Sequence, residues 1–279
     1  MTPRSWLYVP GHRADRIEKA VAGPADAVVI DLEDAVPVHA KTLALANALD
    51  ALEAHPDRTI WVRISAGSGA CAEAEVDALM HADARPAGIR VPKAEVPAVL
   101  ASIAERVCFE VHALVESAAG LLGAPELARC HPRVTGIALG EADLAADLRV
   151  RPDGLVWARG WIVAAARAAQ LGSPVQSVWT DVADLDGLAE SSRLGLTQGF
   201  FGRSVVHPSQ IAPVNAAYTP DAAEVETARR VVGSATRSEC NGESAVLDTD
   251  GRFIDPAVIA NARVVLDRAE RYEHARRNA

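Results

Sequence analysis

Eight short apolar runs, separated by longer alanine-rich segments, are the feature that most limits the folds open to this chain. The runs are continuously hydrophobic rather than alternating, which is typical of parallel strands buried on both faces. They are Trp6–Val9, Ala27–Leu32, Ile60–Ile64, Gly88–Val91, Phe109–Val115, Val134–Leu139, Pro174–Val178 and Gly199–Val206. The segments between them predict helices at Arg13–Ala22, Ala40–Ala54, Ala72–His81, Val96–Glu105, Gly120–Cys130, Leu155–Gln170 and Leu185–Leu194. This alternation predicts an α/β protein, a TIM (β/α)8 barrel.

A doubly wound open sheet is the competing topology. It predicts a glycine-rich GxGxxG turn after the first strand, whereas this chain has Pro10-Gly11-His12 there. A barrel also fits the length of 279 residues, because α/β barrels often use about 250 residues as one domain. We predict a barrel catalytic domain over residues 1–220. A C-terminal helical extension or lid over 221–279 follows, with helices from about Asp221 to Ala235 and from about Pro256 to Ala275.

Composition excludes several classes of protein. The net charge of −9, with no concentrated basic run, argues against nucleic acid as the main ligand. No apolar stretch reaches the roughly 18 residues of a membrane helix, and no segment before the first strand resembles a signal peptide. The four cysteines are scattered without CxxC spacing, which disfavours structural zinc and a disulfide framework. We therefore expect a cytoplasmic protein without nucleic-acid or membrane partners.

Charged residues follow the predicted strands where those strands end. In a barrel, these carboxyl-terminal ends meet at the face that carries the chemistry. The residues concerned are Asp31, Glu33, Asp34, Arg63, Lys93, Glu116, Glu141, Asp143 and His207. So many carboxylates repel one another unless a cation offsets them, and carboxylate oxygens suit Mg²⁺. Glu116 and Asp143, on adjacent strands, are the pair we expect to bind this metal.

Each of these residues also has a structural interpretation. Asp34, Asp143 and Glu116 are each placed to cap the helix that follows. Arg63 is placed to form an ion pair with an acid from the end of the second strand. His207, which precedes a proline, is typical of a turn residue. Their joint position at one face of the barrel is what favours a functional site.

Ten short motifs, taken in order, resemble a citrate lyase beta-subunit-like protein of the HpcH/HpaI aldolase/citrate lyase family. The likeness extends over nearly the whole chain. The motifs are Arg4–Gly11, Asp31–Val36 (DLEDAV), Lys41, Val62–Ile64, Val91–Lys93, Leu114–Ser117, Gly140–Leu144, Gly199-Phe200, Val206–Ile211 (VHPSQI) and Asp250–Asp255.

The resemblance implies a TIM barrel that assembles as a homotrimer, with the C-terminal extension over a neighbouring subunit's active site. It also implies Mg²⁺ and a CoA thioester substrate. The activity implied is a carbon–carbon lyase that cleaves citramalyl-CoA or malyl-CoA, or else citryl-CoA, to acetyl-CoA and a 2-keto acid. Two alternatives stay open. One is a malyl-CoA thioesterase or malate-synthase-like activity, and the other is a beta subunit of a multi-subunit citrate lyase that acts on an acyl-carrier-protein thioester.

The same resemblance implies roles for the residues at the barrel mouth. Glu116 and Asp143 match the metal ligands, although Glu141 is a rival to Asp143. Arg63 matches the substrate-binding and catalytic arginine, and Glu116 is also expected to bind the substrate.

Further roles come from the rest of the matched motifs. Asp255 matches an acid–base aspartate that is offered across the subunit interface. Glu33 and Asp34 match acids that hold metal-bound waters. Arg13 and Lys19 are the residues we expect near the phosphates of CoA.

Overall fold

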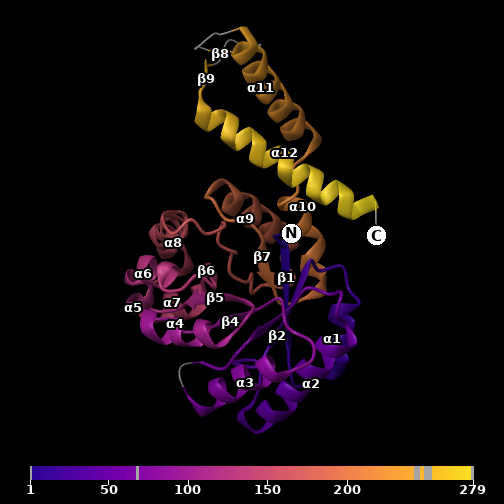
Figure 1. The fold of residues 1–279 in the computed structure, drawn as a ribbon, viewed down its shortest axis with the longest axis vertical. Coiled ribbons are helices and arrows are strands. Elements are labelled where there is room, and N and C mark those ends of the chain that lie inside the picture. The colour runs from indigo at the N-terminus through magenta and orange to yellow at the C-terminus, as the bar shows by residue number, and fades with distance from the viewer. Residues whose placement is uncertain (1, 67–68, 242–245, 248–252, 278–279) are drawn as a thin grey trace. The chain divides into compact units, whose positions relative to one another are not determined.

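The chain forms two compact units, Thr2–Ala216 and Ala217–Ala279. A computed structural model describes residues 2–66, 69–241, 246–247 and 253–277 (Figure 1). In the described part of the first unit, seven parallel strands form one sheet in the order β6-β5-β4-β3-β2-β1-β7. These strands are β1 Ser5–Pro10, β2 Ala27–Asp31, β3 Ile60–Arg63, β4 Gly88–Val91, β5 Glu110–Val115, β6 Val134–Leu139 and β7 Arg203–Val205.

Helices connect successive strands, as the alternating pattern predicts. In the first unit they are α1 Ala14–Val21, α2 Lys41–Ala54, α3 Ala70–His81, α4 Pro97–Arg106, α5 Ala118–Leu122, α6 Ala124–Arg129, α7 Glu141–Leu148, α8 Val156–Ala168, α9 Leu185–Thr197 and α10 Ile211–Ala217, the last ending at the boundary of the units. Short 3-10 helices occupy Val38–Ala40, Pro152–Leu155 and Pro208–Gln210. The α/β fold class is confirmed.

The expectation of a continuous strand at Pro174–Val178 is wrong. Only Gln176 pairs with β7, as an isolated bridge to Arg203. Pro174 has no N–H to donate to a neighbouring strand. On the other side, the hydroxyl of Ser177 donates to the carbonyl of Leu139 in β6 and accepts from the N–H of Glu141 at 3.2 Å. A side chain thus replaces regular backbone pairing where this segment lies between β6 and β7.

Three further boundaries differ from the prediction. The last strand is shorter than Gly199–Val206 because Gly199 and Gly202 adopt left-handed conformations, with φ of 98° and 80°. The helix expected at Gly120–Cys130 is divided at Gly123, where α6 begins with a proline in its first turn. A helix that was not expected, α7, begins directly after β6 and carries two of the predicted site acids.

The second unit contains two long helices, α11 Ala222–Asn241 and α12 Pro256–Arg277, which pack against each other. The short strands β8 Val246–Leu247 and β9 Phe253–Ile254 pair antiparallel between them. α11 is longer than predicted because it continues into the polar stretch after Ala235. None of the helices in the described residues is long and apolar enough to cross a membrane.

Large rings fill the interior of the sheet below the strand ends. Trp6, Trp61 and His112 are in mutual contact, with ring centroids 4.3–5.6 Å apart. The neighbouring strands carry glycine where these rings need space. A Cβ at Gly88 would lie 2.4 Å from the Trp61 ring, and one at Gly136 would lie 2.5 Å from the His112 ring. Large rings thus pack against glycines in this layer, because the rings occupy the volume that the glycines leave.

We predict that Gly88→Ala destabilises the protein by about 1–3 kcal/mol, because the added methyl group overpacks the layer against Trp61. The measurement is the free energy of unfolding in urea. Gly160→Ala is the matched control: that glycine is in α8 and a Cβ there meets nothing within 4 Å. Alanine at that helical position should be neutral or stabilise by up to about 1 kcal/mol. Equal effects of the two substitutions would contradict the packing argument.

Candidate active site

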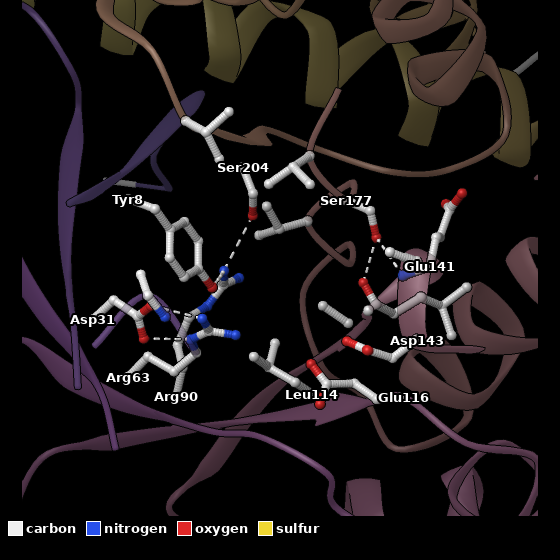
Figure 2. A pocket seen from close by; sticks show the side chains of 18 of the residues that line it. Tyr8, Asp31, Arg63, Arg90, Leu114, Glu116, Glu141, Asp143, Ser177 and Ser204 are labelled. Carbon is white, nitrogen blue, oxygen red and sulfur yellow. Dashed lines mark hydrogen bonds and ion pairs between the residues drawn. The ribbon is translucent and has the colours of Figure 1, made fainter. Parts of the chain in front are cut away.

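A cavity of about 330 Å³ opens at the carboxyl-terminal ends of the strands. Its lining includes the last residues of β1, β2 and β3 and the residues that follow β5 and β6 (Figure 2). Among the predicted site residues, Arg63, Glu116, Glu141 and Asp143 line this cavity. The fold therefore brings the central part of the predicted site to one place, where parallel strands carry their functional side chains.

Arg63 is held by a two-pronged ion pair with Asp31. The two residues are register partners at the ends of β3 and β2. Arg63 Nε donates to Asp31 Oδ1 at 2.6 Å, and Nη2 donates to Oδ2 at 2.7 Å. Burial by itself lowers the pKa of Arg63, but the hydrogen bond to Asp31 and the nearby negative charges together outweigh this and the pKa is raised. The guanidinium group is therefore fixed in direction and always charged.

Glu33 lies between two cations. Its carboxylate is 2.9 Å from Arg63 Nη1 and accepts a hydrogen bond from Lys93 Nζ at 2.6 Å. Burial raises the pKa of Glu33, while the hydrogen bond from Lys93 and the charge of Arg63 act in the opposite direction. Asp34 is 53% exposed and lies 3.5–3.6 Å from the same two cations. Glu33 and Asp34 thus place one buried and one solvent-facing carboxylate beside Arg63.

The backbone of Lys93 also takes part. Its φ is 51°, a left-handed conformation that residues other than glycine rarely adopt. In this conformation the N–H of Lys93 donates to Glu116 Oε2 at 3.0 Å, while the ammonium group reaches Glu33. One residue thus contacts both carboxylates, and unusual backbone conformations of this kind are common at functional sites.

Glu116 is the buried carboxylate of the cavity, with 6% of its surface exposed. It lies directly against Gly140, where a Cβ would approach within 2.6 Å of Oε1. Ser117, not Glu116, caps α5 by accepting the N–H of Gly120 at 3.1 Å. Burial and the nearby charge of Glu33 raise the pKa of Glu116 to about 7, and the charge of Asp143 contributes further. The N–H of Lys93 and the charge of Arg63 act in the opposite direction, but within the described residues no cation forms an ion pair with Glu116. A divalent cation would add positive charge there.

Asp143 and Glu141 both lie in the first turn of α7 but differ in their surroundings. Both oxygens of Glu141 accept hydrogen bonds from Arg159 of α8, at 3.0 and 2.5 Å. Asp143 is exposed, and its carboxylate is on the same side of the cavity as Glu116 (Figure 2). In the described residues, no group of three or more aspartate, glutamate, histidine or cysteine side chains is placed to hold a metal ion together. Two carboxylates with water and ligand oxygens suit Mg²⁺, which usually keeps several waters.

Comparison with known proteins shows the family of this chain. A family model described as HpcH/HpaI aldolase/citrate lyase matches residues 4–208, and one described as a C–C bond lyase of the TIM-barrel fold matches residues 157–273. The chain belongs to the HpcH/HpaI aldolase/citrate lyase family. This confirms the resemblance of its sequence motifs and the TIM-barrel fold.

Three relatives in the family cover almost the whole chain. A (3S)-malyl-CoA thioesterase of Cereibacter sphaeroides is 35% identical over 96% of this chain and 94% of its own length. A citrate lyase subunit beta of Escherichia coli is 33% identical over the same shares of both chains. Protein CitE of Mycobacterium tuberculosis, solved with magnesium, acetoacetate and coenzyme A, has a TM-score of 0.81 and 34% identity over 95% of this chain and 97% of its own.

Other predicted site residues lie apart from the cavity lining. Arg13 precedes α1 and forms an ion pair with Asp15 at the surface, at 2.8 Å, and Lys19 is exposed in the last turn of that helix. Arg16, between them, does line the cavity. Asp255 is in the second unit, where its carboxylate accepts the N–H of Val258 at 2.8 Å in the first turn of α12.

His207 occupies the turn position that its proline neighbour indicates. It precedes the 3-10 helix Pro208–Gln210, and its Nδ1 lies 2.8 Å from the hydroxyl of Ser209. The side chain thus organises the local turn in this family member.

Several cavity residues were not predicted from the sequence. Tyr8, Arg90 and Ser204 come from the interiors of strands, and Ser177 comes from the bridging segment. A signal was present for Arg90, because a charged residue interrupts the otherwise apolar run Gly88–Val91. Buried arginine is rare, and it usually has a partner or a function.

The raised pKa of Glu116 predicts a pH-dependent stability in metal-free protein. The folded state holds this proton more tightly than the unfolded chain, whose carboxyl pKa is about 4.5. The protonated carboxyl group of Glu116 therefore favours the folded state at low pH, and this contribution to stability is lost as the pH rises from about 4.5 to about 7. We expect Glu116→Gln, in EDTA, to be more stable than wild type by about 2–3 kcal/mol at pH 8 and nearly equal at pH 4. Urea unfolding at the two pH values measures this.

The control for that experiment is Glu105→Gln, which changes an exposed glutamate on α4. It should leave the difference between the two pH values unchanged. A pH-independent effect of Glu116→Gln would show that the carboxyl group is not perturbed as described.

Proposed function

We propose that the protein is an Mg²⁺-dependent carbon–carbon lyase for a short 3-hydroxy-dicarboxyl-CoA thioester of the citramalyl, malyl or citryl type. The products are acetyl-CoA and a 2-keto acid. One observation carries the proposal: a single cavity has the carboxylates of Glu116 and Asp143 on one side and the fixed guanidinium group of Arg63 on the other (Figure 2). Family membership supports the reaction class.

Glu116 and Asp143 are the residues that we assign to the metal. Glu141 is less suited because both of its oxygens are already engaged by Arg159. The relative CitE was solved with magnesium, which supports this choice of ion. When bound, Mg²⁺ supplies the positive charge that orients the carboxylate and hydroxyl oxygens of the acid half and favours loss of the hydroxyl proton.

Arg63 and Glu33 act on the two charges that develop in the reaction. Cleavage of the C2–C3 bond leaves its electron pair on the acetyl half as a thioester enolate, while the C3 hydroxyl becomes a ketone. Arg63 stabilises the enolate oxygen, since its direction is fixed in advance by Asp31. Glu33, whose pKa is raised by burial, receives the hydroxyl proton, and Asp34 lies beside it on the solvent-facing side.

We assign the remaining proton transfer to Asp255 of a neighbouring chain in a homotrimer. The enolate carbon must gain a proton to become the methyl group of acetyl-CoA. The resemblance of the motif to those of the family supports an acid–base role for this aspartate. Arg13, which precedes α1, and Lys19, which is exposed on it, are proposed to lie near the CoA phosphates together with Arg16, which lines the cavity.

Two specific relatives favour alternative reactions at the same site. The Cereibacter relative is named a (3S)-malyl-CoA thioesterase. Such an activity breaks the thioester bond by water and releases CoA and the free hydroxy acid, with no carbon–carbon cleavage. The Escherichia coli relative is named a citrate lyase subunit beta, which supports the alternative of a subunit that takes its thioester from an acyl carrier protein.

Incubation of the purified protein with Mg²⁺ and citramalyl-, malyl- or citryl-CoA separates these reactions. We expect acetyl-CoA together with pyruvate, glyoxylate or oxaloacetate, identified by mass spectrometry. EDTA should abolish the release, and added Mg²⁺ should restore it, because Glu116 and Asp143 need the metal to act. Release of CoA with free malate or citramalate would establish a thioesterase instead. No turnover of any CoA thioester would favour the alternative of a thioester carried by an acyl carrier protein.

The role of Asp255 is tested by mixing two defective chains. Asp255→Ala should lower kcat by about 10²- to 10⁴-fold, typical for loss of a general acid, without changing Mg²⁺ affinity. Arg63→Lys should be similarly impaired because lysine cannot form the two-pronged pair. If Asp255 serves a neighbouring chain, co-expression of both variants restores up to about a quarter of the sites in mixed oligomers.

The mixture can also contradict the role assigned to Asp255. Activity no greater than that of the separate variants, in oligomers shown to contain both chains, would place Asp255 outside a neighbour's site. Unimpaired turnover by Asp255→Ala alone would remove it from the mechanism altogether.

A further inference from the structure

Arg90 is a buried arginine on the wall of the cavity. It lies in β4 with 1% of its surface exposed, and it lines the cavity together with Arg63. Arg63 and Arg90 are register partners on adjacent strands, so two positive charges enter the barrel interior side by side. Both guanidinium groups lie within 6 Å of the Tyr8 ring centroid, at 5.3 and 5.7 Å.

The two arginines differ in how their charges are compensated. Asp31 pairs with Arg63 through both carboxylate oxygens, and Glu33 adds a second negative charge to it. In the part of the chain that the structure describes, no carboxylate forms an ion pair with Arg90. Its Nε and Nη2 atoms are buried and have no hydrogen-bond acceptor there. A buried charge without a counter-charge is costly, which indicates that something else offsets it in the working protein.

The immediate neighbours of Arg90 do not neutralise it. Nη1 donates to the hydroxyl oxygen of Tyr8 at 2.7 Å and to that of Ser204 at 3.1 Å. The guanidinium group also packs on the Trp6 ring, 4.7 Å from its centroid. His112 on the next strand carries no negative charge in either protonation state.

The hydroxyl groups make the cluster complementary to an anion. Since Tyr8 and Ser204 both accept from Arg90, the hydrogen of each hydroxyl is available to donate elsewhere. Arg90, Tyr8 and Ser204 therefore present donors from three strands that are distant in sequence, and all three line the cavity. Apolar side chains, among them Leu114, Val175 and Val206, line the same cavity. They suit a short hydrocarbon link between two charged groups of one ligand.

We propose that Arg90, Tyr8 and Ser204 form a subsite for a second carboxylate on the acid half of the substrate. This rests on the proposed lyase function, in which Glu116 and Asp143 hold, through the metal, the carboxylate and hydroxyl of C3. The substrate class is then a 3-hydroxyacyl thioester whose C3 also bears a side arm ending in a carboxylate. A citryl thioester has such an arm, whereas a citramalyl thioester has a methyl group and a malyl thioester has hydrogen.

The direct test compares two unreactive hydroxy acids that differ only in this arm. Racemic malate carries a carboxymethyl group where racemic lactate carries methyl. Isothermal titration calorimetry of each acid, with Mg²⁺ present, gives the ratio of their affinities. A charge-assisted pairing predicts that wild type prefers malate by about 10- to 100-fold. Arg90→Met, which keeps the approximate length of the side chain, should bring the ratio close to that of metal chelation alone, a fall of about tenfold or more.

Arg106→Met is the matched control, because Arg106 is on α4 outside this cavity and pairs with Asp77. It should retain the wild-type ratio. The subsite is overturned if wild type binds the two acids equally, or if Arg90→Met keeps the full preference for malate. The first comparison needs no variant, so a failure of Arg90→Met to fold does not remove the test.

Turnover separates this proposal from the proposed function. The ratio of kcat/KM for citryl-CoA to that for citramalyl-CoA should fall about tenfold or more in Arg90→Met. If the protein prefers malate through Arg90 but cleaves no thioester, the subsite stands and the lyase assignment fails. If it cleaves thioesters but wild type does not distinguish malate from lactate, the lyase stands and the subsite fails.

Discussion

The buried pair between Asp31 and Arg63 organises the open end of the barrel. Each carboxylate oxygen of Asp31 accepts two hydrogen bonds, one of them from the guanidinium group of Arg63. The second comes from the backbone N–H of Glu33 for Oδ1 and from that of Ala35 for Oδ2. The same carboxylate therefore aims Arg63 into the cavity and shapes the loop that carries Glu33 and Asp34. Removing one partner of such a pair leaves an uncompensated buried charge, typically at a cost of about 3–5 kcal/mol. The direction of Arg63 and the conformation of the loop after β2 both depend on this one carboxylate.

Charge is separated across the cavity. Arg63 lies with Asp31 on one side, whereas Glu116 and Asp143 lie on the other (Figure 2). Burial raises the pKa of Glu116, and within the described residues no cation forms an ion pair with this carboxylate, so the acidic side suits a metal. The basic side suits the negative oxygen that develops when a carbon–carbon bond beside a thioester breaks. Fixed charges of this kind act strongly because they need little rearrangement during the reaction.

Relatives with the same barrel carry different names, including a thioesterase and a citrate lyase subunit. Fold alone therefore does not select the substrate, and selection depends on the side chains within the site. The proposed subsite adds residues from the interior of the barrel to that selection. Arg90 and Ser204 project from strands rather than loops, so their positions are fixed by sheet register.

The sequence by itself determined seven of the eight expected strands, the barrel class and most residues at the barrel mouth. Long apolar runs specify buried strands, and parallel strands bring their carboxyl-terminal residues together, so Glu33, Arg63 and Glu116 were predictable. It did not reveal which of Glu141 and Asp143 is engaged elsewhere, because Arg159 lies on another helix. Only the tertiary structure decided that question and brought Arg90 to Tyr8 and Ser204. Those contacts join residues 82 and 114 positions apart, and they exist only after the sheet has curled.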